Sequence, residues 1–287
     1  MIGTTNRSGA GPFTERTPRI VAARRLTRRA GRAEAGRFLA EGAQSVREAL
    51  AYGTVRELFV TTTARDRHPD LVATADANGI PVSEVTERAA AGLSETVTPQ
   101  GIVAVCDLVD QPLDTALAGT PRLVAVLCGI ADPGNAGTVL RVADAAGADA
   151  VLLAGDTVDP HNGKCVRASA GSVFHLPVAR TREVHDALRA CRTAGLRLIA
   201  ADGHADDDLD TAADLAEPTA WVFGSEAHGL PADIRAATDR ALRVPIHGAA
   251  ESLNLATAAA VCLYTTARAQ RHPTQSGTQG RSAGTIS

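Results

Sequence analysis

The pattern of apolar and polar positions between residues 122 and 271 alternates short continuous apolar runs with longer amphipathic stretches. Continuous apolar runs bounded by glycine and polar clusters are typical of strands that are buried on both faces of a parallel sheet. The predicted strands are Leu123–Cys128, Ala150–Ala154, Arg197–Ala201, Ala220–Phe223 and Arg243–Pro245. The predicted helices are Gly137–Ala146, Glu183–Thr193, Pro231–Thr238 and Leu253–Gln270. This part of the chain is therefore predicted to be an α/β domain with helices on both faces of a parallel sheet.

Residues 19–108 alternate less regularly. Helices are predicted at Glu41–Ala51 and Leu71–Asn78, and strands at Val55–Thr61 and Ile102–Cys106, which indicates a second, smaller α/β domain. Proline and glycine between Val109 and Pro121 indicate a linker over residues 109–121. Residues 1–18 and 272–287 are rich in glycine, serine, threonine and proline, so we expect a disordered leader and a disordered tail.

Charge changes this picture at one place. The net charge of -3 gives no indication of a nucleic-acid binder, but seven arginines stand against the single acid Glu34 between Arg19 and Arg37. A guanidinium group presents a donor fork that matches two phosphate oxygens. This segment is a candidate RNA contact or, alternatively, a solvated helix face. The candidate side chains are Arg24, Arg25, Arg28 and Arg29.

The five cysteines are odd in number, scattered, and never spaced as CxxC. We therefore expect neither a disulfide framework nor a zinc site, and no other metal is indicated. Residues 1–18 lack the apolar stretch of a signal peptide, and no apolar run approaches the length that spans a membrane. The expectation is a soluble protein of the cytoplasm with no membrane partner.

The carboxyl ends of parallel strands are where ligands usually bind, so the loops after Cys128, Ala201, Phe223 and Pro245 are the ones to inspect. The first of these loops is a glycine-bearing turn, residues 131–138, that leads into a helix carrying Arg141. Such a turn either holds a phosphate on helix amides or is structural only. It lacks GxGxxG and GxxxxGK[ST], which argues against a nucleotide-binding oxidoreductase or a P-loop enzyme.

Two further loops carry polar residues among glycines. In the turn from Gly224 to Pro231, Glu226 is either a functional carboxylate or a cap of the next helix. In the segment from Val244 to Leu255, Ser252 and Asn254 are functional candidates or N-caps of the final helix. That final helix is apolar almost all round, which predicts burial against its own core or against another subunit.

The order and spacing of these three motifs resemble the signatures of the SpoU (TrmH-like) RNA methyltransferases, a family of the SPOUT class. The motifs are Asn135 with Arg141, the Gly224–Leu230 turn, and Ile246–Leu255, and the resemblance covers about residues 122–270. Residues 37–42 and 100–105 resemble the ribosomal-protein-like substrate-binding domain of the same family.

The resemblance implies an α/β SPOUT catalytic domain with a parallel sheet and a carboxyl-terminal trefoil knot, residues 122–271, behind an RNA substrate-binding domain, residues 19–108. It implies S-adenosylmethionine as methyl donor, held largely by backbone groups near Gly224, Ile246, Leu253 and Leu255. It also implies a homodimer through the final helix. The implied reaction is methylation of a ribose 2'-hydroxyl in structured RNA.

A ribose hydroxyl is a poor nucleophile, so the site must assist its deprotonation and align it with the methyl group. The resemblance assigns the central role to Arg141. Because a guanidinium is a poor base, an RNA phosphate would accept its proton or position it, or Arg141 would stabilise the developing alkoxide. The other implied catalytic residues are Asn135, Glu226, Ser252 and Asn254, and Arg167 is implied to contact RNA phosphate.

Three residues depart from common family patterns: Gly134, Ser225 and Thr265. The tRNA-modifying branch often has His where this chain has Gly134, which favours 23S-type rRNA over tRNA as the substrate. A tRNA 2'-O-methyltransferase and a non-catalytic RNA-binding factor with the same fold remain alternatives. An antibiotic-protection role and ordinary ribosome maturation are both open.

Overall fold

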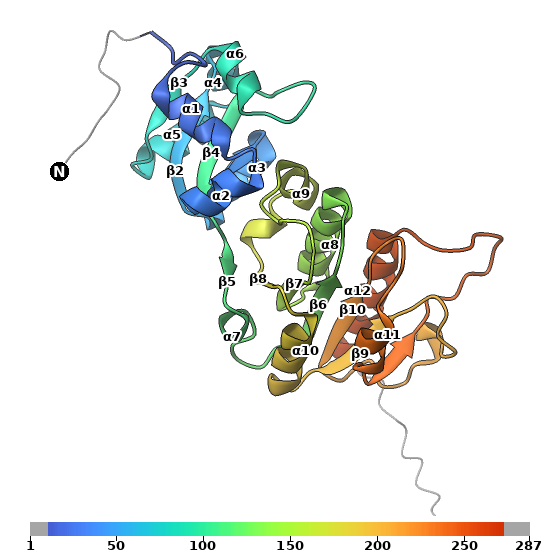
Figure 1. The fold of residues 1–287 in the computed structure, drawn as a ribbon. Helices are drawn as coiled ribbons and strands as arrows, with labels where there is room; N and C mark the ends of the chain where they lie inside the picture. The colour runs from blue at the N-terminus through green and yellow to red at the C-terminus, as the bar shows by residue number, and fades with distance from the viewer. Residues whose placement is uncertain (1–10, 273–287) are drawn as a thin grey trace, which may run out of the picture.

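The computed structural model describes residues 11–272, and its larger sheet has seven strands in the order β11-β9-β10-β6-β7-β8-β5, all parallel to their neighbours (Figure 1). Three predicted strands have the predicted bounds: β6 (Leu123–Cys128), β7 (Ala150–Ala154) and β9 (Arg197–Ala201). β10 (Thr219–Phe223) begins one residue earlier than predicted, and β8 (Val178–Thr181) is an additional strand that the pattern does not predict. The predicted parallel α/β domain is confirmed.

The last predicted strand is wrong in position. β11 is Arg240–Leu242, paired with Ile199–Ala201, rather than Arg243–Pro245. Arg243 leaves this ladder and forms a separate bridge with Asp208, and its guanidinium binds the Asp208 carboxylate at 2.6 Å. Pro245 has no N–H to donate, so the ladder cannot continue through it.

Helices cover both faces of this sheet. On one face, α8 (Pro133–Ala146) and α12 (Leu255–Arg271) share a buried core with alternate residues of β6. On the other face, α10 (Val184–Thr193) and α11 (Ala232–Ala236) pack against the intervening residues. Trp221 is fully buried under α12 and donates its indole N–H to Thr266 Oγ1 at 2.9 Å. The burial of one polar atom is thus compensated by a hydrogen bond.

The amino-terminal unit is built on a four-stranded sheet in the order β1-β4-β2-β3. The strands are β1 (Arg37–Glu41), β2 (Val55–Val60), β3 (Val82–Glu84) and β4 (Ile102–Asp107). Its helices are α1 (Pro18–Arg25), α2 (Arg29–Ala35), α3 (Ala43–Tyr52), α4 (Thr62–Arg67), α5 (Pro69–Ala77) and α6 (Glu87–Gly92). A predicted helix start at Glu41 is wrong because Glu41 ends β1, and Gly42, with φ of 89°, turns the chain before α3.

Two expectations about irregular segments change. Residues 109–121, expected as a linker, contain α7 (Leu113–Ala116) and β5 (Asp110–Gln111), which extends the larger sheet beside β8. The expected disordered leader does not reach residue 18, because the Phe13 amide donates to Glu84 O at 2.8 Å and α1 begins at Pro18. The rest of that leader, residues 1–10, and residues 273–287 of the expected tail lie outside the described part of the chain.

A buried polar cluster joins the two units. The Arg32 guanidinium of α2 is 4% exposed and lies 2.8 Å from Asp159 Oδ2 in the loop after β7. Arg32 Nη1 also donates to the carbonyls of Leu26 and Thr27 at 3.1 Å each. His161 Nε2 accepts from the Val109 amide, so its Nδ1–H donates to Asp159 at 3.2 Å. Burial disfavours the charge on Asp159, yet the bonds from His161 and Arg32 hold its pKa well below the usual range.

A second polar link crosses the same boundary at His175. Its Nδ1 lies 2.8 Å from Asp144 Oδ2 of α8, its Nε2 lies 3.1 Å from Glu48 Oε2 of α3, and its ring meets Tyr52 edge-on at 4.5 Å. Burial alone would lower the pKa of His175, but the two carboxylates outweigh it and the pKa is raised above 6.5. Both carboxylates therefore favour the protonated form of His175, which links the units.

This raised pKa predicts a pH-dependent stability. The contribution of His175 to the free energy of unfolding is fully present below its unfolded pKa of 6.5. It is lost as pH rises through the higher pKa of the folded state. The difference in unfolding free energy between wild type and His175→Gln should therefore be larger at about pH 6 than at about pH 9. Urea unfolding at both pH values measures it. An equal difference at the two pH values would show that His175 acts only by packing.

Within residues 11–272, no helix has the length and apolar character needed to cross a membrane.

Candidate active site

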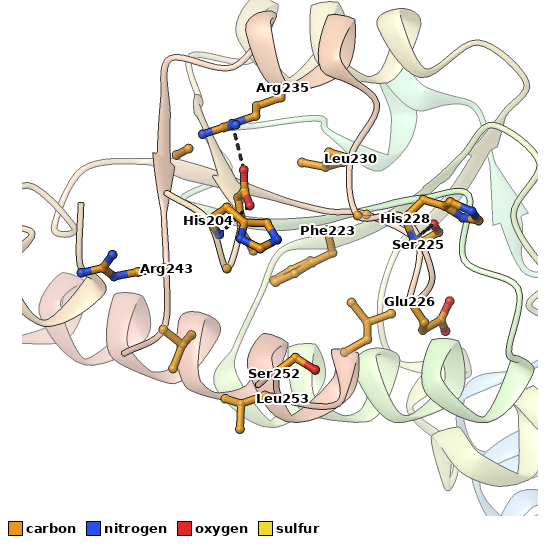
Figure 2. Close-up of a pocket in the computed structure, with 18 of the residues that line it drawn as sticks. His204, Phe223, Ser225, Glu226, His228, Leu230, Arg235, Arg243, Ser252 and Leu253 are labelled. Carbon is orange, nitrogen blue, oxygen red and sulfur yellow. Dashed lines mark hydrogen bonds and ion pairs between the residues drawn. The ribbon is translucent and has the colours of Figure 1, made fainter. Parts of the chain in front are cut away.

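A cavity of about 1380 Å³ opens at the carboxyl edge of the larger sheet, as the strand pattern predicts. Its walls are the loop after β9, the loop after β10, the segment from β11 to α12, and the first turn of α8. Figure 2 shows the Phe223 ring between the loop that carries Ser225 and Glu226 and the segment that carries Ser252 and Leu253. Eight of the nine predicted catalytic and cofactor-binding residues line the cavity: Asn135, Gly224, Glu226, Ile246, Ser252, Leu253, Asn254 and Leu255.

Three of these polar side chains form one hydrogen-bonded chain. Asn135 Nδ2 donates to Glu226 Oε1 at 2.9 Å, and Asn254 Nδ2 donates to Asn135 Oδ1 at 3.0 Å. Asn135 is half-buried, whereas Glu226 and Asn254 are exposed to the cavity. Loops that are 91 and 119 residues apart in the sequence are thereby held together.

The structure decides between the capping alternatives. Asn254 is the N-cap of α12, because its Oδ1 accepts from the Ala256 amide at 2.9 Å, while its Nδ2 remains free to hold Asn135. Glu226 caps no helix, since α11 begins at Ala232 without a side-chain cap. Glu226 therefore belongs to the cavity alone.

Glycine makes the wall after β10 possible. A Cβ on Gly224 would overlap the Gly229 carbonyl group and the Leu230 nitrogen, so no larger residue fits there. Ser225 and Gly229 exchange two backbone hydrogen bonds across this turn, at 3.0 and 2.9 Å. The turn is thus a tight, preformed wall that exposes backbone to the cavity.

Apolar side chains also face the cavity. Ile246 and Leu253 are each 38% exposed, although large aliphatic side chains seldom remain uncovered together within one hollow. Leu255 and Phe223 line the cavity beside them. A flat, largely apolar ligand group would be covered well by these side chains.

Arg141 is the exception among the predicted residues. It lies on α8, is exposed, and is not part of the cavity wall. Within residues 11–272 no carboxylate lies within ion-pair distance of its guanidinium. Within a single copy of the chain, Arg141 therefore does not line the cavity beside Asn135, Glu226 and Asn254.

The predicted RNA-binding arginines fall into two groups. Arg24, Arg28 and Arg29 are exposed and have no ion pair within the described chain, whereas Arg25 pairs with Glu34 at 2.7 Å. Arg167 is 28% exposed and lies 3.1 Å from Glu41 Oε2, so its guanidinium already has a partner across the boundary between the units.

Sequence reasoning misses Asp202 and Arg235, which both line the cavity and pair at 2.8 Å; Figure 2 labels Arg235. Asp202 directly follows β9, so its place at the carboxyl edge was the available indication. No group of three or more His, Cys, Asp or Glu side chains arranged to hold a metal occurs among residues 11–272.

Comparisons with known proteins show which family the chain belongs to. A profile of the SpoU rRNA Methylase family matches residues 122–264, and a profile of the MRM3-like substrate binding domain matches residues 17–104. The 23S rRNA (guanosine(2553)-2'-O)-methyltransferase RlmP of Bacillus subtilis is 37% identical over 237 residues, 81% of this chain and 89% of that protein. The chain belongs to the SpoU rRNA methylase family.

Solved structures of an rRNA methyltransferase and of a SpoU methyltransferase share most of this architecture. An AdoMet-bound rRNA methyltransferase from Sinorhizobium meliloti has a TM-score of 0.79 and 32% identity, covering 92% of this chain and 98% of that one. The SpoU methyltransferase AviRb from Streptomyces viridochromogenes, in complex with AdoMet, has a TM-score of 0.77 and 30% identity, and the match covers 89% of this chain and 99% of that one. The expected fold class and the substrate-binding domain are confirmed; the knot stays a prediction.

Proposed function

We propose that this SpoU family member is an S-adenosylmethionine-dependent RNA 2'-O-ribose methyltransferase that acts on 23S-type rRNA. The observation that carries the proposal is the convergence of Asn135, Glu226 and Asn254 on the rim of a glycine-walled, partly apolar cavity. Two relatives support the proposal, because RlmP and the RlmB protein of Bordetella pertussis are named as 23S rRNA 2'-O-methyltransferases.

The cavity fits the methyl donor in its chemistry. The close approach at Gly224 leaves backbone polar groups at the wall, and Ile246, Leu253 and Leu255 offer apolar surface for an adenine ring. These four residues are the proposed cofactor contacts. When bound, S-adenosylmethionine supplies an electrophilic methyl group on a sulfonium.

The chain's own side chains would position the ribose. Asn135 and Asn254 fix each other through one hydrogen bond, so each presents its remaining donor or acceptor in a set direction. Glu226 accepts from Asn135 and orients it, and Ser252 offers a hydroxyl on the opposite wall. Arg141 would stabilise the alkoxide that forms as the 2'-hydroxyl passes its proton to solvent water, with an RNA phosphate holding the guanidinium. The alkoxide oxygen would then take the methyl group as the sulfonium S–CH3 bond breaks.

Because Arg141 lies outside the cavity of its own chain, we propose that a second copy completes the site through α12. The face of α12 turned away from the core carries Thr257, Tyr264 and Arg268, and Tyr264 is 50% exposed. A homodimer through this face would cover Tyr264. It would also place α8 of one copy beside the second copy.

A direct test supplies labelled methyl donor to unmodified 23S rRNA transcripts and, separately, to tRNA. The proposal expects incorporation into the 23S transcript at one nucleotide. Incorporation into tRNA alone would move the substrate to the tRNA alternative, and no incorporation into either RNA would remove the enzymatic function.

The arginine-rich segment yields a prediction on salt dependence. Replacing Arg24, Arg28 and Arg29 by Gln should flatten the slope of log K against log salt, by about 0.7 to 0.9 for each phosphate that is no longer neutralised. Filter binding to the 23S transcript between low and moderate salt measures the slope. Arg189→Gln is the control, because Arg189 is an exposed arginine on a helix outside this segment. An unchanged slope in the triple variant would return the segment to a solvated helix face.

We also place the enzyme in the cytoplasm. All five cysteines are free and buried, and burial raises the pKa of the Cys165 thiol to about 12. Such thiols suit a reducing compartment, where an rRNA-modifying enzyme meets its substrate.

A further inference from the structure

Lys164 is the only lysine of the sequence, and it lies over the first turn of α8. It is the second residue of α9 (Gly163–Ser169), whose N-cap Asn162 accepts from the Lys164 amide at 2.9 Å. Its ammonium donates to both carboxylate oxygens of Asp132, at 3.0 and 3.1 Å. Asp132 is the N-cap of α8, three residues before Asn135. The lysine is therefore a neighbour of the proposed active site on the carboxyl edge of the sheet.

Two glycines of α8 determine this placement. A Cβ on Gly137 would overlap the Cys165 carbonyl oxygen and would lie 2.7 Å from Ala168 Cβ, so α9 packs directly on the α8 backbone. A Cβ on Gly134 would lie 3.0 Å from Lys164 Cε and 2.8 Å from Asp132 Oδ1. The lysine stem thus lies against Gly134, the residue adjacent to Asn135, where an added Cβ would crowd both the lysine and Asp132.

The bond between Lys164 and Asp132 is easily exchanged. The two side chains are 55% and 47% exposed, and exposed pairs of this kind contribute little to stability. Asp132 also accepts from the amides of Gly134 and Asn135, so it stays hydrogen-bonded when the lysine leaves. Lys164 holds the pKa of the Asp132 carboxyl below its usual range, with the Gly134 amide contributing second. The ammonium can therefore turn to a phosphate at small cost.

We propose that Lys164 binds a backbone phosphate of the substrate RNA beside the nucleotide whose ribose faces Asn135, and that Gly134 provides the space for it. Lys164 is then a positioning residue that sets how the RNA strand enters the cavity. The inference rests on the proposed function and adds to it a strand contact on the α9 side of the site.

The first test compares kinetic constants of matched variants on the 23S transcript. Lys164→Gln should raise KM for RNA about tenfold, the loss of one charge-assisted hydrogen bond, while kcat and the Kd for S-adenosylmethionine stay within about twofold. Lys164→Arg should restore KM. Arg189→Gln removes a different exposed cation of the same domain, one that also pairs with an aspartate, Asp186, and should leave KM unchanged.

Two further variants keep the charge of Lys164 and change its surroundings. Asp132→Asn keeps an effective N-cap but removes the competing carboxylate, so KM for RNA should fall below that of wild type. Gly134→Ala puts a methyl group against the lysine stem, so KM should rise by a smaller factor than in Lys164→Gln. If Lys164 and Asp132 served only to stabilise the fold, Asp132→Asn and Gly134→Ala would not change KM for RNA in opposite directions.

A second test needs no activity, because a single lysine can be labelled selectively. Acetylation of the folded protein by an amine-reactive ester, followed by mass spectrometry, reports the labelling rate of Lys164, with the chain's α-amine as internal reference. The 23S transcript should slow labelling of Lys164 several-fold, whereas S-adenosylmethionine alone should not.

The outcomes separate the inference from the proposed function. If wild type methylates 23S rRNA, but Lys164→Gln has the wild-type KM and the transcript leaves Lys164 labelling unchanged, the inference is overturned and the function stands. If wild type methylates no RNA, the proposed function fails, and the inference that rests on it fails too.

Discussion

Arg141→Ala should lower kcat for RNA methylation on the order of 100- to 1000-fold, the loss expected when one group that stabilises a developing oxyanion is removed. RNA affinity, cofactor affinity and thermal stability should change little, because Arg141 is exposed and has no carboxylate partner within residues 11–272. Single-turnover methylation of the 23S transcript, with binding measured separately, checks both parts.

The matched control is Arg189→Ala, another exposed arginine on a helix of the same domain. It should retain wild-type turnover. Arg141→Ala also discriminates between the enzyme and a non-catalytic RNA-binding factor of the same fold. If wild type and Arg141→Ala bind RNA alike and neither transfers a methyl group, the binding factor is the correct function.

A mixing experiment extends this prediction to the proposed dimer. Arg141→Ala and Asn135→Ala should each be inactive alone, yet heterodimers should regain one complete site if the arginine comes from the partner copy. About a quarter of wild-type activity is expected in an equal mixture after exchange of subunits, because half of the dimers are mixed and each has one of two sites intact. No recovery despite demonstrated exchange would place both residues in one chain's site.

Arg32→Met should destabilise the protein by about 3 kcal/mol, because it removes the nearer guanidinium partner of the buried Asp159 and leaves only Arg180, 3.6 Å from Asp159 Oδ1. Asp159 keeps its bonds from His161, which is why the low end of the range for broken buried pairs applies. Chemical denaturation measures the loss, and the double variant Arg32→Met with Asp159→Leu should recover most of it.

Arg25→Met is the control for this prediction, since Arg25 forms an exposed pair with Glu34. Its stability should change by about 1 kcal/mol or less. If Arg32→Met also lost no more than that, the buried pair would not be what holds the substrate-binding unit to the catalytic unit.

The contrast between Arg32 and its neighbours marks a limit of sequence reasoning. Seven arginines within Arg19–Arg37 look alike in the sequence, and their pattern predicts a solvated or RNA-facing segment throughout. Only the helical phase of α2 and the position of Asp159, 127 residues away, make Arg32 a buried structural residue. Long-range pairing of this kind leaves no trace in local periodicity.

The strands also differ in how well the sequence predicts them. β6, β7 and β9 are predictable with their bounds because every residue of β6 and β7 and the three central residues of β9 are buried, which gives continuous apolar runs. β8 has two buried residues and β5 has only two residues in all, so neither produces a pattern. α8 begins one turn earlier than predicted because Asp132 caps it and Pro133 occupies its first position, a start that the following glycine obscures.

The candidate site residues come from the family resemblance and only in part from physics. Periodicity places a ligand site at the carboxyl edge, and the cavity is there. The hydrogen-bonded chain through Asn135 could not follow from spacing, since its members come from three separate segments. Neither could the position of Arg141 outside the cavity wall, which depends on the helical phase of α8.

The most direct test of the central claim is the chemical position of the transferred methyl group. Wild type is incubated with labelled S-adenosylmethionine and unmodified 23S rRNA, and the product is hydrolysed with alkali, which cannot cleave a linkage whose 2'-oxygen is methylated. The proposed function predicts that the label remains in one alkali-resistant dinucleotide. Label recovered only in ordinary mononucleotides, with the methyl group on a base, would contradict it.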